Sequence, residues 1–580
     1  MIVLANFSNG SAQTESITIK NAGKIKILGT AILKINSDQG KIRTENTTDN
    51  LENAGTIELN GSANTFTAVT DDNCDDFTAD DPTIAYGSSA IARVPGLVSY
   101  NGIATNQDVQ ARFYTDLAMD GTGTKGIPTG VFVSGEYTAP GTGARTYTGD
   151  FTYDGDTDQT ILGEDGSGPA NGAYDNVVLQ GDGVKTLATG TTADMTNLNV
   201  FAGTTASDNG VVINGNMNVA GAATQAAGNT ISIATGGSTP GVLNINGVGP
   251  STLAGTVNVG ENGEFAMGTN AVATLSGTLA LGDFSDAKIG LAANSELTIS
   301  GSMTNANLAC DNATFDVAST VEYDGVAGQL VMGTTEANPY GNLNISAAGE
   351  KTVATGDSVV AAGNFALADD NFNLGECVQD QFLWLTDATK TATYGAIATL
   401  SPFEVVGSFR RSINNNTSTL AFNNYATTVA ITDPADVNWI ELCVVPGDVG
   451  YYSGYDADKD VKRSIKYKYD IADPSTTNWS AEIAYGYKTS ELETANNNDG
   501  FKNSLRFRET DGSTLDEKVA TNVQPVRILG TDPFSSVKLA AIRETGRRVA
   551  PQSILAEVAN ANLLFLRGGP AEFISVAAGR

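Results

Sequence analysis

The chain has 580 residues, a formal net charge of −32 and no histidine. The strong negative charge disfavours nucleic acid and anionic membranes as partners, because like charges repel. The lack of histidine excludes histidine-dependent catalytic triads and histidine-ligated zinc sites. No stretch reaches the roughly 20 apolar residues of a membrane-spanning helix, so we expect no membrane insertion. Hydrophobic residues make up 41% of the chain, which is enough for a folded core.

A short motif near the start of the chain occurs twice. The segment 21–29 (NAGKIKILG) returns as 53–61 (NAGTIELNG), and looser copies follow at 254–260, 276–282 and 297–301. In each copy a turn leads into a strand of alternating apolar and polar residues. Such units are typical of a β-solenoid, whose turns pair with one another and bury alternate residues. We expect four of these residues to point into the core and four to point out, respectively Ile25, Ile27, Ile57, Leu59 and Lys24, Lys26, Thr56, Glu58.

A longer unit occurs three times between residues 98 and 353. Each copy has a strand that ends in Tyr-Asx-Gly, then a glutamine, then a Tyr-x-Asx strand, and finally Gly-x-Lys. An Asx-Gly pair after a strand is a turn signal. The repeated order predicts a β-repeat array over residues 98–400, after solenoid turns at 1–97. The tyrosines, glutamines and lysines that define the three copies are Tyr100, Gln107, Tyr114, Lys125; Tyr153, Gln159, Tyr174, Lys185; and Tyr323, Gln329, Tyr340, Lys351.

This order resembles the repeats of large secreted surface proteins of Bacteroidota and related bacteria. Those repeats read Tyr-Asn-Gly, then Gln, then Tyr-x-Asn-Leu and Gly-x-Lys-Thr, and the resemblance covers about residues 98–370. It implies an extracellular or cell-surface location. It also implies a structural or adhesive role, because such proteins serve as adhesins, matrix components and filament subunits. Extra short units fill about 200–305, so it stays open whether the array is one continuous solenoid.

The texture of the sequence changes near residue 402, where longer strands and more aromatic residues begin. The strand and turn spacing predicts a β-sandwich over residues 401–525. Its Gly-Ser-Phe-x-Arg opening is similar to a module that follows such repeats in the same class of surface proteins. Residues 526–580 form a short basic segment, which we expect to dock on a neighbour. Its positive charge favours either head-to-tail attraction to the acidic body or a solvated basic surface. The whole chain is therefore expected to be all-β.

The four cysteines are far apart in the sequence. Four cysteines allow three sets of pairings, and the sequence does not choose among them. We favour isolated small core residues, with one disulfide as the alternative. These residues are Cys74, Cys310, Cys377 and Cys443.

Two acidic stretches carry the hard oxygen ligands that Ca²⁺ prefers. The first comprises Asp71, Asp72, Asp75 and Asp76, for which the alternative is a solvated acidic loop. In the second, the spacing is that of positions 1, 3 and 5 of a calcium loop, but a glutamine stands where that loop needs glycine. The repeat explains this second set better than calcium does. Calcium is nevertheless the one cofactor that we consider, and the second set is Asp154, Asp156 and Asp158.

No motif of an enzyme stands out in the sequence. There is no phosphate-binding loop, dinucleotide fingerprint or nucleophile elbow. Carboxylates are plentiful, but none forms a recognisable acid–base pair beside an aromatic platform, as glycoside hydrolysis would require. We therefore expect no enzymatic activity. The scattered tryptophans are expected in the core; they are Trp384, Trp439 and Trp479.

These features predict a structural subunit of an extracellular bacterial filament, sheath or surface layer. Open solenoid ends polymerise unless they are capped, and the sequence shows no polar cap at either end. We expect copies of the chain to join head to tail by β-strand addition. The alternative is a cell-surface adhesin or carbohydrate-binding stalk, whose partners would be glycans or neighbouring cells. The residues expected at the joint are Ile17, Ile19, Ile25, Ile27, Arg547, Arg548, Phe573, Ile574 and Val576.

Overall fold

A computed structural model describes three parts of the chain. Between residues 16 and 68 it describes the strands alone. Residues 94–433 are described except for 103–106, 165–171, 202–209, 235–239, 283–285, 306–312, 376, 378–380, 396–402 and 414–417. After residue 436 it describes only the strands, which lie between 437 and 567.

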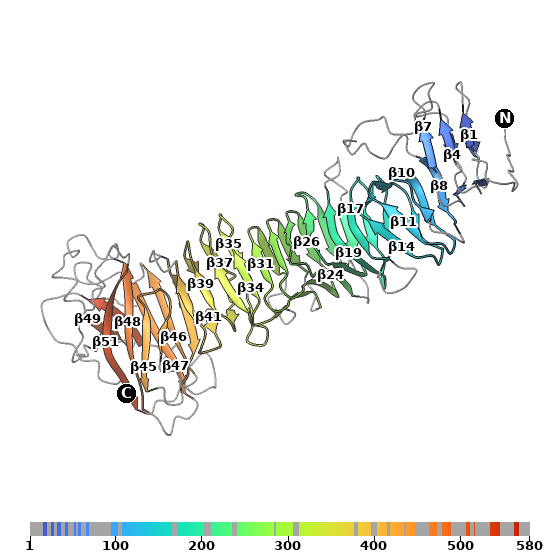
Figure 1. The fold of residues 1–580 in the computed structure, drawn as a ribbon. Helices are drawn as coiled ribbons and strands as arrows, with labels where there is room; N and C mark the ends of the chain where they lie inside the picture. Colours follow the sequence, from blue (N-terminus) through green and yellow to red (C-terminus); the bar gives the residue numbers. More distant parts are fainter. Residues whose placement is uncertain are drawn as a thin grey trace. The chain divides into compact units, whose positions relative to one another are not determined.

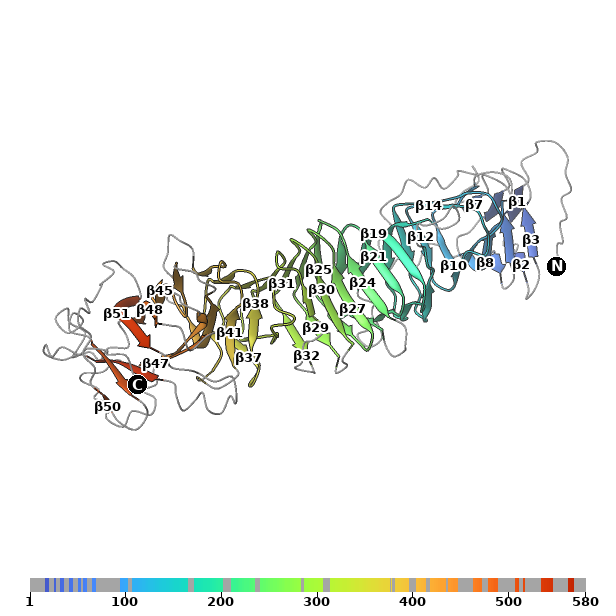
Figure 2. The same cartoon turned by 90° about the horizontal axis from the view of Figure 1, so that it is seen from below.

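The described residues are all-β and contain no helix. Their parallel strands stack into a β-solenoid of about 12 turns, which confirms the predicted fold class for this part of the chain. The chain divides into two compact units, Met1–Ile289 and Gly290–Arg580. Figure 1 and Figure 2 show the rows of short parallel strands within each unit.

The first unit begins with two turns of three short strands each. The strands of the second turn pair in parallel with those of the first: β1 with β4, β2 with β5, and β3 with β6. The next strand, β7, extends the ladder of β1 and β4, and β8 extends the ladder of β3 and β6. The bounds are β1 (Ser16–Ile19), β2 (Ile25–Ile27), β3 (Ile32–Ile35), β4 (Lys41–Thr44), β5 (Leu51–Asn53), β6 (Thr56–Leu59), β7 (Thr65–Ala68) and β8 (Val94–Tyr100).

The remaining turns of this unit extend the ladder of β8 and add two more. One added ladder comprises β9 (Gln107–Asp108), β11 (Lys125–Pro128) and β14 (Arg145–Thr148). The other comprises β16 (Gln159–Ile161), β18 (Lys185–Leu187), β20 (Gly210–Ile213), β23 (Thr230–Ile233), β26 (Thr256–Val259) and β29 (Thr278–Leu281). The strands that extend the ladder of β8 are β10 (Phe113–Met119), β12 (Val131–Val133), β13 (Tyr137–Thr138), β15 (Asp150–Tyr153), β17 (Tyr174–Leu179), β19 (Thr192–Val200), β21 (Asn216–Val219), β22 (Ala223–Gln225), β24 (Gly241–Ile245), β25 (Pro250–Leu253), β27 (Gly263–Met267) and β28 (Val272–Leu275).

The core of the solenoid consists of columns of aliphatic side chains. In β26, Val257 and Val259 are buried while Thr256 and Asn258 are half-buried, because successive side chains of a strand point to opposite faces. In-register pairing places Val257 between a leucine and an isoleucine of the neighbouring turns. Each such buried side chain contributes about 1.5–3 kcal/mol. Short alternating segments such as TVNV are therefore sufficient to form a turn. The inward column through Val257 is Val211, Ile231, Val257 and Leu279.

The predicted inside–outside pattern of the opening motif is confirmed where its side chains are described. Ile57 is fully buried, and Thr56 and Glu58 are half-buried. The side chains of Lys24, Ile25, Lys26, Ile27 and Leu59 lie outside the described part of the chain. The three looser copies of the motif also form strands, in β26, β29 and β31 (Glu296–Ile299).

The second unit continues with three parallel ladders. One comprises β31, β34, β36, β39 and β42; the second comprises β35, β37 and β40; the third comprises β38 and β41. The strand β30 (Lys288–Leu291) contains the boundary between the two units. The bounds are β32 (Ser302–Asn305), β33 (Ala313–Phe315), β34 (Thr320–Tyr323), β35 (Gln329–Val331), β36 (Asn342–Ile345), β37 (Lys351–Val353), β38 (Val359–Ala361), β39 (Phe365–Leu367), β40 (Phe372–Asn373), β41 (Phe382–Leu385) and β42 (Ala392–Tyr394).

The strand β43 (Val405–Ser412) ends the parallel stacking of two ladders. Its first residues pair in parallel with β40 and its later residues pair in parallel with β41. Its other edge pairs antiparallel with β46, so no further parallel strand can follow there. Two antiparallel ladders complete the unit, β43–β46–β47–β52–β49–β50 and β44–β45–β48–β51. Their bounds are β44 (Thr419–Ala421), β45 (Thr428–Asp433), β46 (Val437–Pro446), β47 (Arg463–Ile471), β48 (Asn478–Lys488), β49 (Arg506–Thr510), β50 (Leu515–Asp516), β51 (Phe534–Thr545) and β52 (Asn562–Arg567).

The basic C-terminal segment contributes strands to both antiparallel ladders. β51 pairs with β48, and β52 lies between β47 and β49. That residues 401–525 pack as a β-sandwich remains a prediction.

Buried polar side chains close this end of the parallel stack. The Asn423 side chain donates hydrogen bonds to the carbonyl oxygens of Val405 and Gly407, at 2.8 and 2.9 Å. The fully buried guanidinium of Arg411 donates to the carbonyl oxygens of Lys390 and Ala421. The expectation that neither end of the solenoid carries a polar cap is therefore wrong for this end.

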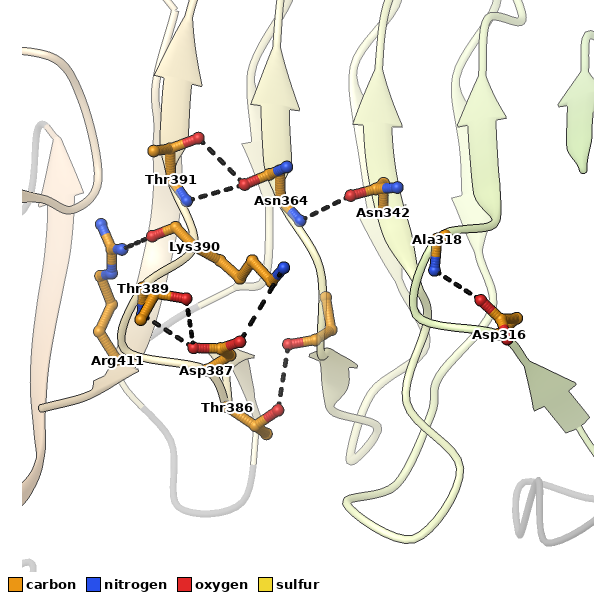
Figure 3. A network of polar contacts seen from close by, with 11 residues as sticks. Asp316, Ala318, Asn342, Asn364, Thr386, Asp387, Thr389, Lys390, Thr391 and Arg411 are labelled. Atoms are coloured by element: carbon orange, nitrogen blue, oxygen red, sulfur yellow. Dashed lines mark hydrogen bonds and ion pairs between the residues drawn. The ribbon is translucent and has the colours of Figure 1, made fainter. Parts of the chain in front are cut away.

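Polar side chains also connect successive turns at one corner, as Figure 3 shows. The backbone N–H of Asn364 donates to the side chain of Asn342 at 2.9 Å. The backbone N–H of Thr391 donates in turn to the side chain of Asn364 at 3.0 Å. Each asparagine thus supplies an acceptor for a backbone N–H of the next turn, which would otherwise lack a partner in the ladder.

Candidate functional site

The glutamine and the lysine of each repeat lie side by side inside the solenoid. In-register pairing joins Gln159 in β16 to Lys185 in β18. The same pairing joins the other two glutamines to their lysines. All six side chains are at most 5% exposed, which is unusual for lysine. The three pairs are Gln107–Lys125, Gln159–Lys185 and Gln329–Lys351.

Both side chains hydrogen-bond to the backbone of the glycine in the Tyr-Asx-Gly corner. In the second copy, the N–H of Gly155 donates to Gln159 Oε1 at 2.7 Å, and Lys185 Nζ donates to the Gly155 carbonyl oxygen at 2.8 Å. Lys185 Nζ also donates to the carbonyl oxygen of Gly183 at 2.6 Å. A Cβ at Gly155 would lie 2.6 Å from Gln159 Cδ, so only glycine leaves room for this arrangement.

The first and third copies repeat these contacts. Gly102 N donates to Gln107 Oε1 at 3.0 Å, and Gly325 N donates to Gln329 Oε1 at 3.1 Å. Their lysines, Lys125 and Lys351, donate to the carbonyl oxygens of the same two glycines at 3.1 and 2.7 Å. The repeated residues are therefore an internal hydrogen-bonding unit rather than a surface that could bind a ligand.

The hydroxyls of the two tyrosines in each copy hydrogen-bond to the backbone at a second corner of the turn. The Tyr174 hydroxyl donates to the carbonyl oxygen of Leu162 at 3.1 Å, and the N–H of Leu162 donates to the Tyr153 hydroxyl at 3.0 Å. The two hydroxyl oxygens are 2.9 Å apart, so Tyr153 donates to Tyr174. The third copy is built in the same way, with Tyr323 and Tyr340 around Met332. Burial raises the pKa of Tyr153, which keeps its hydroxyl protonated.

A buried ion pair fills the interior between the first two copies. The Arg145 guanidinium donates to both carboxylate oxygens of Glu164, which is fully buried. The Tyr147 hydroxyl donates to Glu164 at 2.7 Å. Burial raises the pKa of the Glu164 carboxyl, while these hydrogen bonds lower it. The two side chains that hydrogen-bond to this carboxylate, those of Arg145 and Tyr147, are themselves buried.

Burial also lowers the pKa of the repeat lysines. The pKa of Lys185 falls to about 8 because burial disfavours the charged ammonium, although Asp154, Asp156 and Asp158 act in the opposite direction. These three carboxylates, which the sequence offered to calcium, therefore act through their charge on a buried lysine. Two of them are also hydrogen-bonded, since Asp154 accepts from Gln180 Nε2 at 3.0 Å and Asp158 accepts from the N–H of Val184 at 3.1 Å.

No group of three acidic or cysteine side chains that could hold a metal ion occurs among the described residues. Asp154, Asp156 and Asp158 are among the described residues and do not form such a group. Asp71, Asp72, Asp75 and Asp76 lie outside the described residues, and calcium binding there remains a prediction.

An aromatic patch surrounds Arg410 on β43. Its guanidinium carbon lies 4.0 Å from the ring centre of Phe382 and 4.1 Å from that of Trp439. The guanidinium also donates to Glu441 at 2.8 Å. The expectation that the tryptophans are core residues holds only in part for Trp384 and Trp439, which are half-buried beside Arg410. Trp479 has no described side chain.

A disulfide joins Cys377, in the segment between β40 and β41, to Cys443 in β46. Their Cα atoms are 5.8 Å apart, and 66 residues separate them in the sequence. The disulfide alternative therefore holds for this pair, whereas Cys74 and Cys310 lie outside the described residues. The bond connects the last parallel turns to the antiparallel ladder of β43 and β46.

The first turn, residues 16–40, presents strand edges at the other end of the solenoid. β1, β2 and β3 each pair with a strand of the second turn, and no described strand pairs with their outer edges. Ile32 is 48% exposed, and Leu33 is half-exposed although it pairs with the fully buried Ile57. Lys34 and Glu58 form an ion pair at 2.7 Å. This edge can take a further strand.

The residues predicted at the joint are only partly described. Ile17 and Ile19 lie in β1, and Ile25 and Ile27 lie in β2, with side chains outside the described part of the chain. The C-terminal members of the set lie outside the described residues altogether; they are Arg547, Arg548, Phe573, Ile574 and Val576.

Comparisons with protein-family models, curated proteins and solved structures find no match for this chain. The described part of the chain has no helix with the length and hydrophobicity needed to cross a lipid bilayer.

Proposed function

We propose that the chain is a structural subunit of an extracellular bacterial filament, sheath or surface layer, and that copies join head to tail by β-strand addition. The observation that carries this proposal is the first turn. Its three strands have outer edges without a described strand partner, next to half-exposed Ile32 and Leu33. Unpaired parallel edges with apolar side chains beside them favour the addition of another strand.

The internal chemistry of the repeats supports a mechanical role. Gln159, Lys185 and their counterparts hold successive turns together through buried hydrogen bonds. Gln159 Nε2 donates to the carbonyl oxygens of Val133 and Gly135, which lie on the preceding turn, at 2.9 and 2.7 Å. Pulling two turns apart would leave these groups without partners in the core, which is costly. Such an array suits a subunit that bears load.

The disulfide supports a location outside the cytoplasm. Structural disulfides persist in oxidising compartments and are rare in reducing ones. The bond between Cys377 and Cys443 joins two parts of the fold that are 66 residues apart in the sequence. It therefore favours a structural rather than a catalytic use of these cysteines.

Removing the first strand tests the proposed joint. We expect deletion of residues 1–20, which includes β1 (Ser16–Ile19), to abolish assembly of the purified chain. Circular dichroism of the deleted protein should still show its β-structure, because the remaining ladders do not depend on β1. Normal polymers formed by this folded variant would contradict strand addition at the N-terminal edge.

The aromatic patch favours a second candidate, an adhesin or carbohydrate-binding stalk. Aromatic rings that are not fully buried offer an apolar surface to a ligand, and Phe382, Trp384 and Trp439 provide three half-buried rings around Arg410. A glycan array probed with the whole chain should then give reproducible hits that Trp439→Ala removes. Absence of binding to the array would leave the structural subunit as the better account.

A further inference from the structure

The first turn is basic, as the C-terminal segment 526–580 is, whereas the chain as a whole is acidic. Residues 16–40 contain four lysines and one aspartate, a net charge of +3. The whole chain carries −32, so the remaining residues together carry −35. The charged residues of the first turn are Lys20, Lys24, Lys26, Lys34 and Asp38.

Two of these lysines stand opposite glutamates of the second turn. The strand register pairs Lys26 in β2 with Glu52 in β5, and Lys34 in β3 with Glu58 in β6. The second pair forms an ion pair at 2.7 Å, with the lysine side chain 54% exposed. Lys34 of the first turn thus meets an acidic residue of the second turn. On the outer side of the first turn, no described strand supplies a counterpart.

We infer that the first turn is an electrostatic docking end that receives an acidic, strand-forming surface of a second copy of this chain. This inference rests on the proposed function and adds which end is the acceptor and what kind of surface it accepts. The other end of the stack is closed in two of its ladders. β46 pairs with the part of β43 that continues the β41 ladder, and Asn423 hydrogen-bonds to Val405 in the part that continues the β40 ladder.

The chemistry of the end favours a polypeptide partner over a polyanionic sugar. Three backbone edges need N–H and C=O partners along their length, which a strand supplies. Ile32 and Leu33 also need apolar cover. The body of the same chain provides negative charge in excess, and opposite charges speed the encounter and fix its orientation.

The test measures the critical concentration for assembly of the full chain, by sedimentation, at about 50 and about 500 mM sodium chloride. For the wild type we expect the critical concentration to rise about tenfold at the higher salt. Lys34→Glu should raise it about fivefold at low salt, because an attraction becomes a repulsion. Lys288→Glu is the matched control. It reverses an exposed lysine of β30, far from the first turn in the sequence, and should change the critical concentration less than twofold.

The double variant Lys34→Glu with Glu58→Lys separates docking from folding. It keeps an ion pair between β3 and β6 but leaves the reversed charge at position 34 of the outermost turn. We expect it to assemble as poorly as Lys34→Glu. Assembly like that of the wild type would show that Lys34 only holds the first turn in place, and would overturn the inference.

The remaining outcomes are also decisive. Assembly of the wild type that responds neither to salt nor to Lys34→Glu overturns the docking inference and leaves the proposed function standing. Equal loss of assembly in Lys288→Glu overturns it as well, since the effect would then be one of total charge. A wild type that stays monomeric at both salt concentrations overturns both proposals. Monomers that bind an anionic polysaccharide such as alginate through Lys34 would make the end a glycan site instead.

Discussion

The buried lysines of the repeat show what a single residue does in this fold. The recurrence of Gln and Lys in fixed order is visible in the sequence, but their inward orientation is not. Lysine side chains are mostly exposed in folded proteins. The alternation of apolar and polar residues around Lys185 does not show whether its side chain points into the core or to solvent. The decisive feature is the glycine corner, whose carbonyl groups are turned away from water and need a donor. Only the stacking of turns reveals this.

The charge of Lys185 makes the stability of the fold depend on pH. Its pKa is about 8 in the folded chain and near 10.5 when unfolded. Between these values the unfolded chain binds more protons than the folded chain, so the free energy of unfolding rises with pH. Lys125 and Lys351 shift in the same direction because they too are buried. We expect the melting temperature to increase from about pH 8 to about pH 10.

The matched variant for this prediction is Lys185→Gln, which retains two donors for the carbonyl groups but cannot titrate. Its melting temperature should rise less over the same pH range. Above about pH 10 the trend should reverse, because the unfolded chain loses tyrosine protons that the buried Tyr153 keeps. Equal slopes for the wild type and the variant between about pH 8 and pH 10 would contradict the assignment to Lys185.

The strand β43 is the element at which the architecture changes. The sequence predicts a change near residue 402, and the change occurs there. It does not predict that one strand continues two parallel ladders and begins an antiparallel one. A period of two in the side chains is common to both kinds of pairing, so local pattern cannot distinguish them. The cap formed by Arg411 and Asn423 escaped prediction for a related reason, since its partners are backbone carbonyl groups distant in the sequence.

The disulfide should stabilise this transition. It closes a loop with a sequence separation of 66 residues, for which chain entropy predicts a contribution of about 4 kcal/mol. We expect the double variant Cys377→Ser with Cys443→Ser to unfold at a lower denaturant concentration than the wild type. Adding a reductant should lower the midpoint of the wild type to that of the variant and leave the variant unchanged. A wild-type midpoint that does not respond to complete reduction would contradict a structural role.

The molecule as a whole is the level at which the sequence was most informative. Motifs such as NAGTIELNG predict an all-β solenoid because each buried position recurs in the next turn, and the described ladders confirm it. Function is harder to predict. The residues that recur from copy to copy lie inside the solenoid, so they say nothing about what its surface binds. Asp154 illustrates this difficulty, because the spacing that suggested calcium belongs to a carboxylate that accepts a hydrogen bond from Gln180 and acts on the charge of Lys185.

Electron microscopy of the purified full chain in negative stain, at low salt, tests the central claim most directly. The account predicts extended filaments, tubes or two-dimensional layers that form without any other component. Well-dispersed single particles at concentrations where the protein is folded would contradict a structural subunit that assembles with itself.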